Sequence, residues 1–173
     1  MMAYLSSESF VTGKAPNKSG NNHPILAPYG IFKTSDGEIA VAPASDKFCS
    51  IFLECIDLTS LLENELYKNN SNRMKNRDSL NEIVNKRMIS ETSDFWIKKL
   101  NKAGCPAAKI VSLPEALNSQ LIQDNEMVIS SNGPEGRQIK MTGFPVKLSD
   151  TPSQLYRYPP LLGEHTNEIL KTI

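Results

Sequence analysis

The stretch that decides the fold is Tyr29-Gly30-Ile31-Phe32-Lys33-Thr34-Ser35-Asp36-Gly37-Glu38-Ile39-Ala40-Val41-Ala42. The Asp36-Gly37 dipeptide is typical of a tight hairpin turn, because these residue types tolerate the positive φ values that such turns require. Strand-like runs lie on both sides of this dipeptide. The stretch therefore predicts two antiparallel strands, 29–34 and 38–42, joined by a turn at residues 35–37.

Helices are predicted on the C-terminal side of this hairpin. Ser45 is a suitable N-cap for the first of them. A longer helix is expected over residues 72–90, and Thr92 caps a further helix that Gly104 ends in a left-handed conformation. Apolar residues recur at helical spacing in all three, and Trp96 is most simply a core residue. These positions are Phe48, Ile51, Phe52, Cys55, Ile56, Leu80, Ile83, Val84, Phe95, Trp96 and Leu100.

The other predicted elements are shorter. Ser112-Leu113-Pro114-Glu115 is a capping box with proline near the helix start, so a short helix begins there. The remaining elements are a helix at 2–12, a coil at 13–28, a strand at 106–111, a hairpin of 127–130 with 137–141, and a C-terminal helix from about residue 166.

These elements predict an α+β fold: a small domain of antiparallel β-hairpins packed with helices, flanked by extended linker arms. The expected parts are a linker helix and coil at 1–28, the small α+β domain at 29–142, and a returning arm with a short helix at 143–173. The strands occur as hairpins, with no β-α-β succession and no glycine-rich phosphate loop. The sequence therefore does not encode a nucleotide-binding sheet.

Composition argues against several classes of protein. Nineteen basic and nineteen acidic residues give a net charge of zero, which does not favour a nucleic-acid partner. The three cysteines, Cys49, Cys55 and Cys105, form no C-x-x-C pair, so neither a disulfide framework nor a zinc site is expected. The N-terminus does not resemble a signal peptide, and no apolar run reaches the ~20 residues that cross a bilayer. These features predict a soluble, cytoplasmic protein without a membrane partner.

Two segments offer candidate chemistry. His23 lies in Gly20-Asn21-Asn22-His23-Pro24, where amides and an imidazole could donate hydrogen bonds to a carboxylate or thioester carbonyl. From these residues alone, a polar linker turn with a surface histidine is the favoured interpretation. Asp46 begins the helix after the hairpin, where a carboxylate interacts favourably with the helix dipole, and a mechanistic role for it is the alternative.

Other residues are better explained without a catalytic role. His165 is adjacent to Glu164 and Thr166 at a helix start, whereas a catalytic triad assembles from separate segments. Cys105 has no basic neighbour that would lower the pKa of its thiol. A set of basic residues could contact the phosphates of coenzyme A, but acidic residues alternate with it, which favours a solvated helix face. This set is Lys68, Arg73, Lys75, Arg77, Lys86 and Arg87.

Six motifs, taken in order, resemble those of the family III CoA-transferases, also called the CaiB/BaiF family. Together they cover nearly the whole chain. They are Thr12-Gly13 through Gly20-Asn21-Asn22-His23-Pro24, Ala27-Pro28-Tyr29-Gly30 through Gly37, Trp96 with Ala103-Gly104-Cys105-Pro106, Leu113-Pro114-Glu115-Ala116, Leu148-Ser149-Asp150-Thr151-Pro152, and Pro159-Pro160-Leu161-Leu162-Gly163-Glu164-His165-Thr166.

The resemblance implies that this chain corresponds to the C-terminal part of such an enzyme: linker, small domain and returning tail. The family's other half is a Rossmann-like domain that carries a catalytic aspartate, so no catalytic residue is assigned in this chain. The partners implied are that N-terminal half, an acyl-CoA, and a second copy in a homodimer. Coenzyme A thioester is a substrate, and no covalently bound cofactor is expected. The substrate-binding residues implied are Gly20, Asn21, Asn22, His23 and Tyr29, with Asp46 as a weaker candidate.

The function implied is transfer of CoA between carboxylic acids through an aspartyl-acyl anhydride and an aspartyl-CoA thioester, and we expect the chain to be inactive alone. Two alternatives stay open. One is a non-enzymatic truncated or assembly module that retains the small-domain fold. The other is a fragment of an acyl-CoA racemase of the same superfamily, since racemases place a glutamate about where Asp46 lies.

Overall fold

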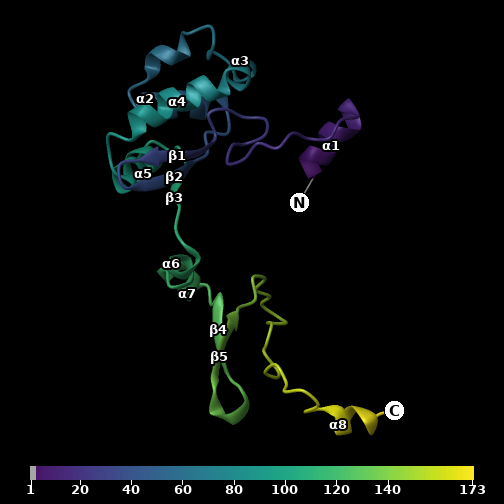
Figure 1. The fold of residues 1–173 in the computed structure, drawn as a ribbon. Coiled ribbons are helices and arrows are strands. Elements are labelled where there is room, and N and C mark those ends of the chain that lie inside the picture. Colours follow the sequence, from purple (N-terminus) through teal and green to yellow (C-terminus); the bar gives the residue numbers. More distant parts are fainter. Residues whose placement is uncertain (1–2) are drawn as a thin grey trace. The chain divides into compact units, whose positions relative to one another are not determined.

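The computed structural model describes residues 3–173 and divides the chain into two compact units, with the boundary between Ile110 and Val111 (Figure 1). The predicted α+β class is confirmed, because both units combine helices with small antiparallel sheets. The limits of a 29–142 domain stay a prediction. No helix among residues 3–173 has the length and apolar character needed to cross a membrane.

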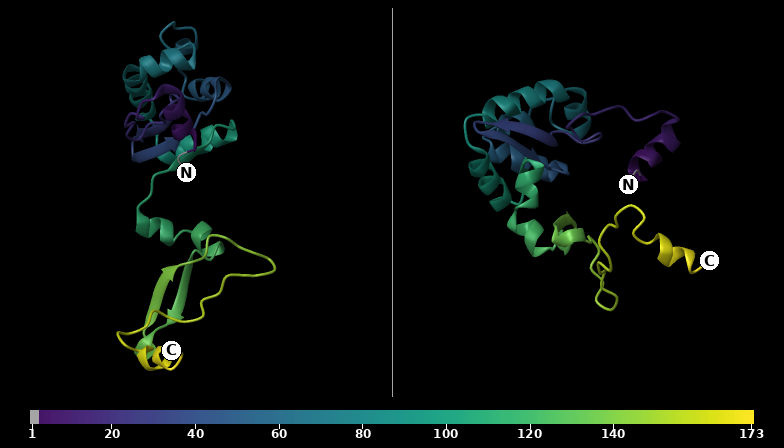
Figure 2. Two further views of the ribbon diagram at one scale, coloured as in Figure 1. Left: turned by 90° about the vertical axis from the view of Figure 1, so that its right-hand side faces the viewer. Right: turned by 60° about the horizontal axis from the view of Figure 1, so that its bottom comes forward.

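The first unit builds a three-stranded antiparallel sheet in the order β1-β2-β3. Helix α4 contacts the sheet along β1, and α5 contacts it along β2 and β3 (Figures 1 and 2). The elements are α1 (Ala3–Thr12), β1 (Gly30–Thr34), β2 (Gly37–Val41), α2 (Asp46–Cys55), the 3-10 helix η1 (Thr59–Leu62), α3 (Asn70–Lys75), α4 (Arg77–Met88), α5 (Ser93–Lys102) and β3 (Ala107–Lys109).

The second unit consists of small elements joined by extended chain. Ser112 caps its first helix through the predicted capping box with Glu115, which is confirmed. Its elements are α6 (Leu113–Leu117), α7 (Gln120–Asp124), β4 (Val128–Asn132), the 3-10 helix η2 (Pro134–Gly136), β5 (Gln138–Thr142) and α8 (Thr166–Leu170). Strands β4 and β5 pair in antiparallel fashion as the second predicted hairpin, with Ser130 opposite Lys140.

The first hairpin is confirmed, but its turn is not the one that the sequence predicted. Thr34 pairs with Gly37, so the turn consists of Ser35 and Asp36, and neither Asp36 nor Gly37 has a positive φ. The Asp36 carboxylate accepts hydrogen bonds from the Ser93 backbone N–H at 2.7 Å, the Ser93 hydroxyl at 2.8 Å and the Thr34 hydroxyl at 3.0 Å. The turn is therefore held by a side chain that reaches the start of α5.

The predicted helix over 72–90 is two helices. Helix α3 begins after its N-cap Asn69, and the backbone leaves the helical conformation at Asn76, with φ −113° and ψ 28°. The Asn76 side-chain amide donates to the carbonyls of Leu66 and Asn72. Asparagine competes in this way with regular helical hydrogen bonding, which explains the break between α3 and α4.

Trp96 belongs to the first unit's core, as predicted. It is fully buried, and its indole N–H donates to the carbonyl of Met88 at 2.7 Å. Among the described residues, every buried hydrophobic side chain lies at or before Cys105. The second unit instead exposes Leu113, Leu121, Val146, Tyr156, Leu162, Leu170 and Ile173. Only the first unit thus has a hydrophobic core within the described chain.

The hydrogen bonds to the Asp36 carboxylate predict that the unfolding free energy decreases at acid pH. They lower the pKa of this carboxyl, with the hydrogen bond from the Ser93 backbone as the largest cause. Its contribution to stability is present above the ordinary pKa of 3.8 and is lost as the pH falls through the lower pKa of the folded state. The difference in unfolding free energy between the wild type and Asp36→Asn should therefore stay constant from about pH 5 to 8 and shrink below about pH 4. Urea titrations across this range measure it, and a pH-independent difference would contradict a stabilising role for the hydrogen bonds to Asp36.

Candidate functional site

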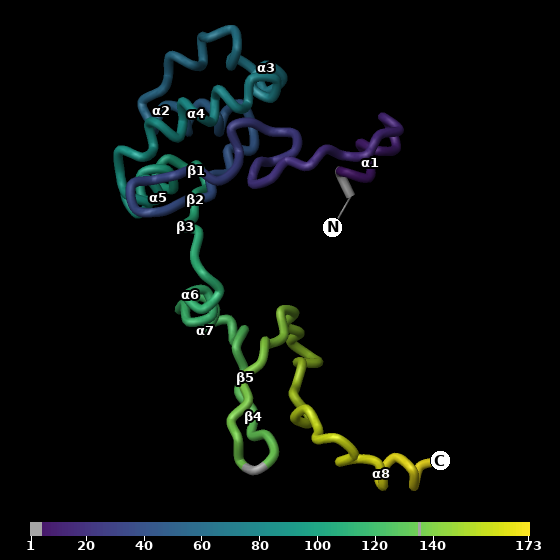
Figure 3. Tube along the Cα trace, viewed as in Figure 1, coloured from purple at the N-terminus to yellow at the C-terminus, as the bar shows by residue number. Residues whose placement is uncertain are grey.

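The coil before β1, together with the first residue of β1, forms a closed loop, residues 20–30, which we call the strap (Figure 3). Its two ends meet where Asn22 and Gly30 form an antiparallel bridge, and the His23 N–H donates to the Tyr29 carbonyl at 2.9 Å. A Cβ at Gly30 would lie 2.8 Å from the Asn21 carbonyl oxygen, so a larger residue does not fit there. The strap is thus a defined structure rather than a featureless linker.

The strap brings two of its rings together. The His23 imidazole stacks on the Tyr29 ring with centroids 4.6 Å apart and planes 28° from parallel. The Ile25 N–H donates to Nδ1 of His23 at 3.3 Å. Because Nδ1 accepts this hydrogen bond, the neutral imidazole carries its proton on Nε2. His23 can therefore donate a hydrogen bond from Nε2.

A row of polar residues on α3 and α4 holds the strap. We call this row, Asn70, Arg73, Arg77, Asn81 and Asn85, the polar stripe. Asn70 and Arg73 share one side of α3, and Arg77, Asn81 and Asn85 share one side of α4, because residues three or four apart in one helix lie on the same side. The stripe bonds to strap residues along its length and, at Asn85, to the Lys33 N–H of the adjoining strand at 2.8 Å.

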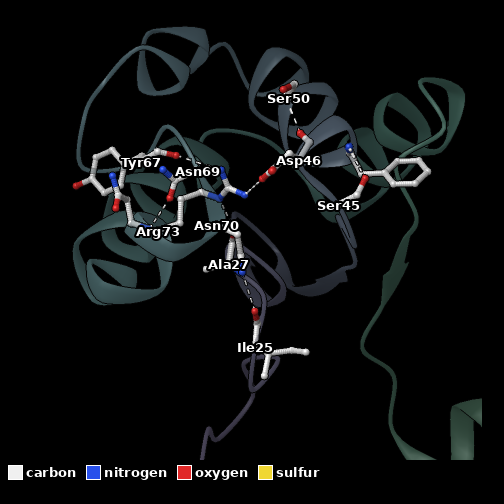
Figure 4. A network of polar contacts seen from close by, with 11 residues as sticks. Ile25, Ala27, Ser45, Asp46, Ser50, Tyr67, Asn69, Asn70 and Arg73 are labelled. Atoms are coloured by element: carbon white, nitrogen blue, oxygen red, sulfur yellow. Dashed lines mark hydrogen bonds and ion pairs between the residues drawn. The ribbon is translucent and has the colours of Figure 1, made fainter. Parts of the chain in front are cut away.

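Arg73 is the most buried member of the stripe (Figure 4). Its Nε donates to the Ala27 carbonyl at 2.5 Å, its Nη1 to the Tyr67 carbonyl at 3.1 Å, and its Nη2 to the Asp46 carboxylate. Asn70 adds two bonds, donating to the Ile25 carbonyl at 2.9 Å and accepting from the Ala27 N–H at 3.1 Å. Figure 4 shows these bonds joining the strap to α2 and α3.

Arg77 and Asn81 hold the part of the strap around His23. Nη2 of Arg77 donates to the carbonyls of His23 at 2.7 Å and Leu26 at 3.2 Å. The Asn81 side-chain amide donates to Oδ1 of Asn22 at 3.0 Å. Buried Nε of Arg77 and Oδ1 of Asn81 have no hydrogen-bond partner among the described residues.

The electrostatics of the strap favour a neutral imidazole. Partial burial lowers the pKa of His23, and the nearby positive charge of Arg77 lowers it further. Near pH 7, His23 is therefore a neutral hydrogen-bond donor beside an aromatic ring. Such a group can bind a thioester carbonyl or a carboxylate and stabilise negative charge that develops on its oxygen.

The structure corrects the sequence interpretation of two basic residues. Arg73 is 3% exposed and Arg77 is half-buried, so neither lies on a solvated helix face. Asp46, at the start of α2, is exposed but pairs with Arg73, a partner that the sequence did not predict. The polar stripe could have been predicted from its spacing in the sequence, because Asn and Arg recur at helical intervals beside the apolar positions Leu80 and Val84.

The remaining candidates stay outside this site. Cys105 is fully buried, and burial raises the pKa of its thiol to about 12, so it does not supply a thiolate near neutral pH. His165 belongs to the second unit, where its Nδ1 lies 3.5 Å from the Glu168 carboxylate. Thr166 is the first residue of α8, and His165 is its N-cap without a side-chain cap bond.

Comparisons with known proteins decide the family. A family model described as CoA-transferase family III matches residues 1–166. The chain belongs to CoA-transferase family III. The resemblance drawn from its motifs is thereby confirmed.

Proteins similar to this chain include CoA-transferases and a CAIB/BAIF family protein of known structure. The chain is 28% identical over 172 residues to succinyl-CoA:glutarate CoA-transferase of Homo sapiens, covering 99% of this chain and 39% of the relative. It is 30% identical over 138 residues to acetyl-CoA:oxalate CoA-transferase of Acetobacter aceti, covering 80% and 34%. The crystal structure of a CAIB/BAIF family protein from Brucella suis matches with a TM-score of 0.76 and 26% identity, over 99% of this chain and 44% of that protein. The chain therefore spans about two fifths of the length of these proteins.

Proposed function

We propose that this chain supplies the C-terminal part of a family III CoA-transferase, which transfers CoA between carboxylic acids. The observation that carries the proposal is the strap, a closed loop in which His23 is neutral, stacked on Tyr29 and held by the polar stripe. Membership of the family, over residues 1–166, supports the same function.

The catalytic carboxylate would come from the part of the enzyme that this chain does not include. In the reaction that the family resemblance implies, an aspartate attacks the thioester carbonyl and expels CoA as a thiolate, which leaves an aspartyl-acyl anhydride. The thiolate then attacks the aspartyl carbonyl, which releases the first acid and forms an aspartyl-CoA thioester. A second carboxylate reverses these steps, so that two simpler exchanges replace a difficult one.

In this proposal the strap lies beside the reacting acyl group. Its substrate-binding residues are Gly20, Asn21, Asn22, His23 and Tyr29. Each attack places negative charge on a carbonyl oxygen, and a fixed donor such as Nε2–H of His23 stabilises that charge. The Tyr29 ring supports the imidazole and gives the acyl group an apolar neighbour. Asp46 has a structural role in this proposal, because its carboxylate is paired with Arg73.

Replacing His23 tests the proposed role of the strap. The test uses a chimeric protein in which this chain replaces the matched region of human succinyl-CoA:glutarate CoA-transferase. We call this protein the joined enzyme. His23→Ala should lower kcat roughly 100-fold, the usual size of losing one donor to a developing oxyanion. Chromatographic separation of the CoA thioesters formed from succinyl-CoA and glutarate measures the rate.

His165→Ala is the matched control, because it removes the only other histidine of the chain. It should leave kcat within about twofold, as expected for a surface substitution. Equal losses in the two variants, or none in His23→Ala, would contradict a substrate contact at the strap.

A further inference from the structure

Two arginines, Arg73 of α3 and Arg77 of α4, bind the strap in different ways. All three nitrogens of the Arg73 guanidinium donate, to Ala27, Tyr67 and Asp46, and the side chain is 3% exposed. Arg77 uses Nη2 for two strap carbonyls and leaves buried Nε without a partner among the described residues. A buried donor left unpaired costs free energy, so Arg77 is not the side chain that stability alone would favour.

Arg77 and Asn81 form hydrogen bonds to strap residues on both sides of His23. Arg77 binds the carbonyls of His23 and Leu26, which lie at the two ends of the turn that contains Pro24 and Ile25. Asn81 binds the side chain of Asn22, whose backbone bridges to Gly30. The backbone is therefore fixed on both sides of His23, which fixes where the imidazole points.

We propose that Arg77 and Asn81 are positioning residues, which hold the strap so that the stacked rings of His23 and Tyr29 face the reacting acyl group. This inference rests on the proposed function of the strap. Neither residue needs to touch the substrate, because both act through the backbone and side chain of residues 22–26. The charge of Arg77 also contributes to the lowered pKa of His23, after the larger effect of burial.

The first measurement is the titration of His23 by proton NMR in the full 173-residue chain. The chain has two histidines, so the His165 signal is an internal reference in every sample. Arg77→Met should move the His23 midpoint up towards the ordinary value of 6.5, because it removes a nearby positive charge. Arg77→Lys keeps that charge and should keep most of the lowered midpoint.

The second measurement is transfer of CoA by the joined enzyme. Arg77→Met should lower kcat about tenfold, because a misplaced donor stabilises the oxyanion less well. Arg77→Lys should recover most of this loss, and Asn81→Ala should lower kcat several-fold without moving the His23 midpoint. If Arg77→Met does not fold, Arg77→Lys and Asn81→Ala still give the test.

Lys86→Met is the matched control, since Lys86 is exposed on the same helix and the substitution removes the same charge. It should change neither the His23 midpoint nor kcat. The inference is overturned if Arg77→Met and Lys86→Met behave alike in both measurements. If Arg77→Met moves the midpoint while His23→Ala leaves kcat unchanged, the contact between Arg77 and the strap stands and the proposed function of the strap is wrong.

Discussion

Replacing Arg73 with methionine should lower the unfolding free energy of the first unit by about 2–6 kcal/mol. The substitution leaves the carbonyls of Ala27 and Tyr67 without their donor, and these residues are 3% and 4% exposed. Each buried acceptor that loses its partner costs roughly 1–3 kcal/mol. The bond to Asp46 adds little, because that carboxylate is 69% exposed and solvent screens the pair.

Trp96 reports this unfolding directly, since it is the only tryptophan of the chain and is fully buried in the first unit. Lys75→Met is the matched control, because it removes the same charge from an exposed position of α3 and should change stability by less than about 0.5 kcal/mol. Asp46→Asn keeps an oxygen that can accept from Arg73 and should cost less than about 1 kcal/mol. Urea midpoints that agree between Arg73→Met and Lys75→Met would refute the structural role of Arg73.

Local rules predicted much of this fold. The caps Ser45, Thr92 and Ser112 and the left-handed Gly104 occur where their residue types indicated. The first hairpin was also predicted, although for an incomplete reason. Its turn residues are Ser35 and Asp36, and the bond from Asp36 to Ser93 joins positions 57 apart in the sequence. A local pattern does not contain such a contact.

The candidate site was predicted only in part. The resemblance to the family directed attention to residues 20–24 and Tyr29, and these residues do form one loop in the structure. The polar stripe was missed, because Arg73 and Arg77 among acidic neighbours look like a solvated helix face. Their role depends on the strap carbonyls, about 50 residues away in the sequence, so it becomes visible only after the chain has folded.

The largest expected effect concerns the transfer activity itself. The 173-residue chain alone should transfer no CoA, whereas the joined enzyme should transfer it. In this proposal the aspartate that forms the covalent intermediates lies in the roughly three fifths of the relatives that this chain does not match. Neither Asp46 nor Cys105 is expected to replace it, since Asp46 is paired with Arg73 and the Cys105 thiol has a raised pKa.

The second unit gives a physical reason for the same result. Its exposed side chains include Leu113, Leu121, Tyr156 and Leu162, and none of its described hydrophobic residues is buried. Ordering a residue costs roughly 1–2 kcal/mol, which a segment without buried apolar surface does not offset. Exposed apolar surface of this extent is typical of an interface. We therefore expect it to be covered by a partner that corresponds to the part of the relatives that this chain does not match.

The most direct test of this account is one transfer assay on three samples: the chain alone, the remaining part of the human relative alone, and the joined enzyme. Each is incubated with succinyl-CoA and glutarate, and the CoA thioesters are separated by chromatography. Our account predicts a new thioester only with the joined enzyme, at a rate that falls when His23 is replaced by alanine. Transfer by the chain alone, abolished by changing one of its own residues, would contradict it, as would a folded joined enzyme that forms no product.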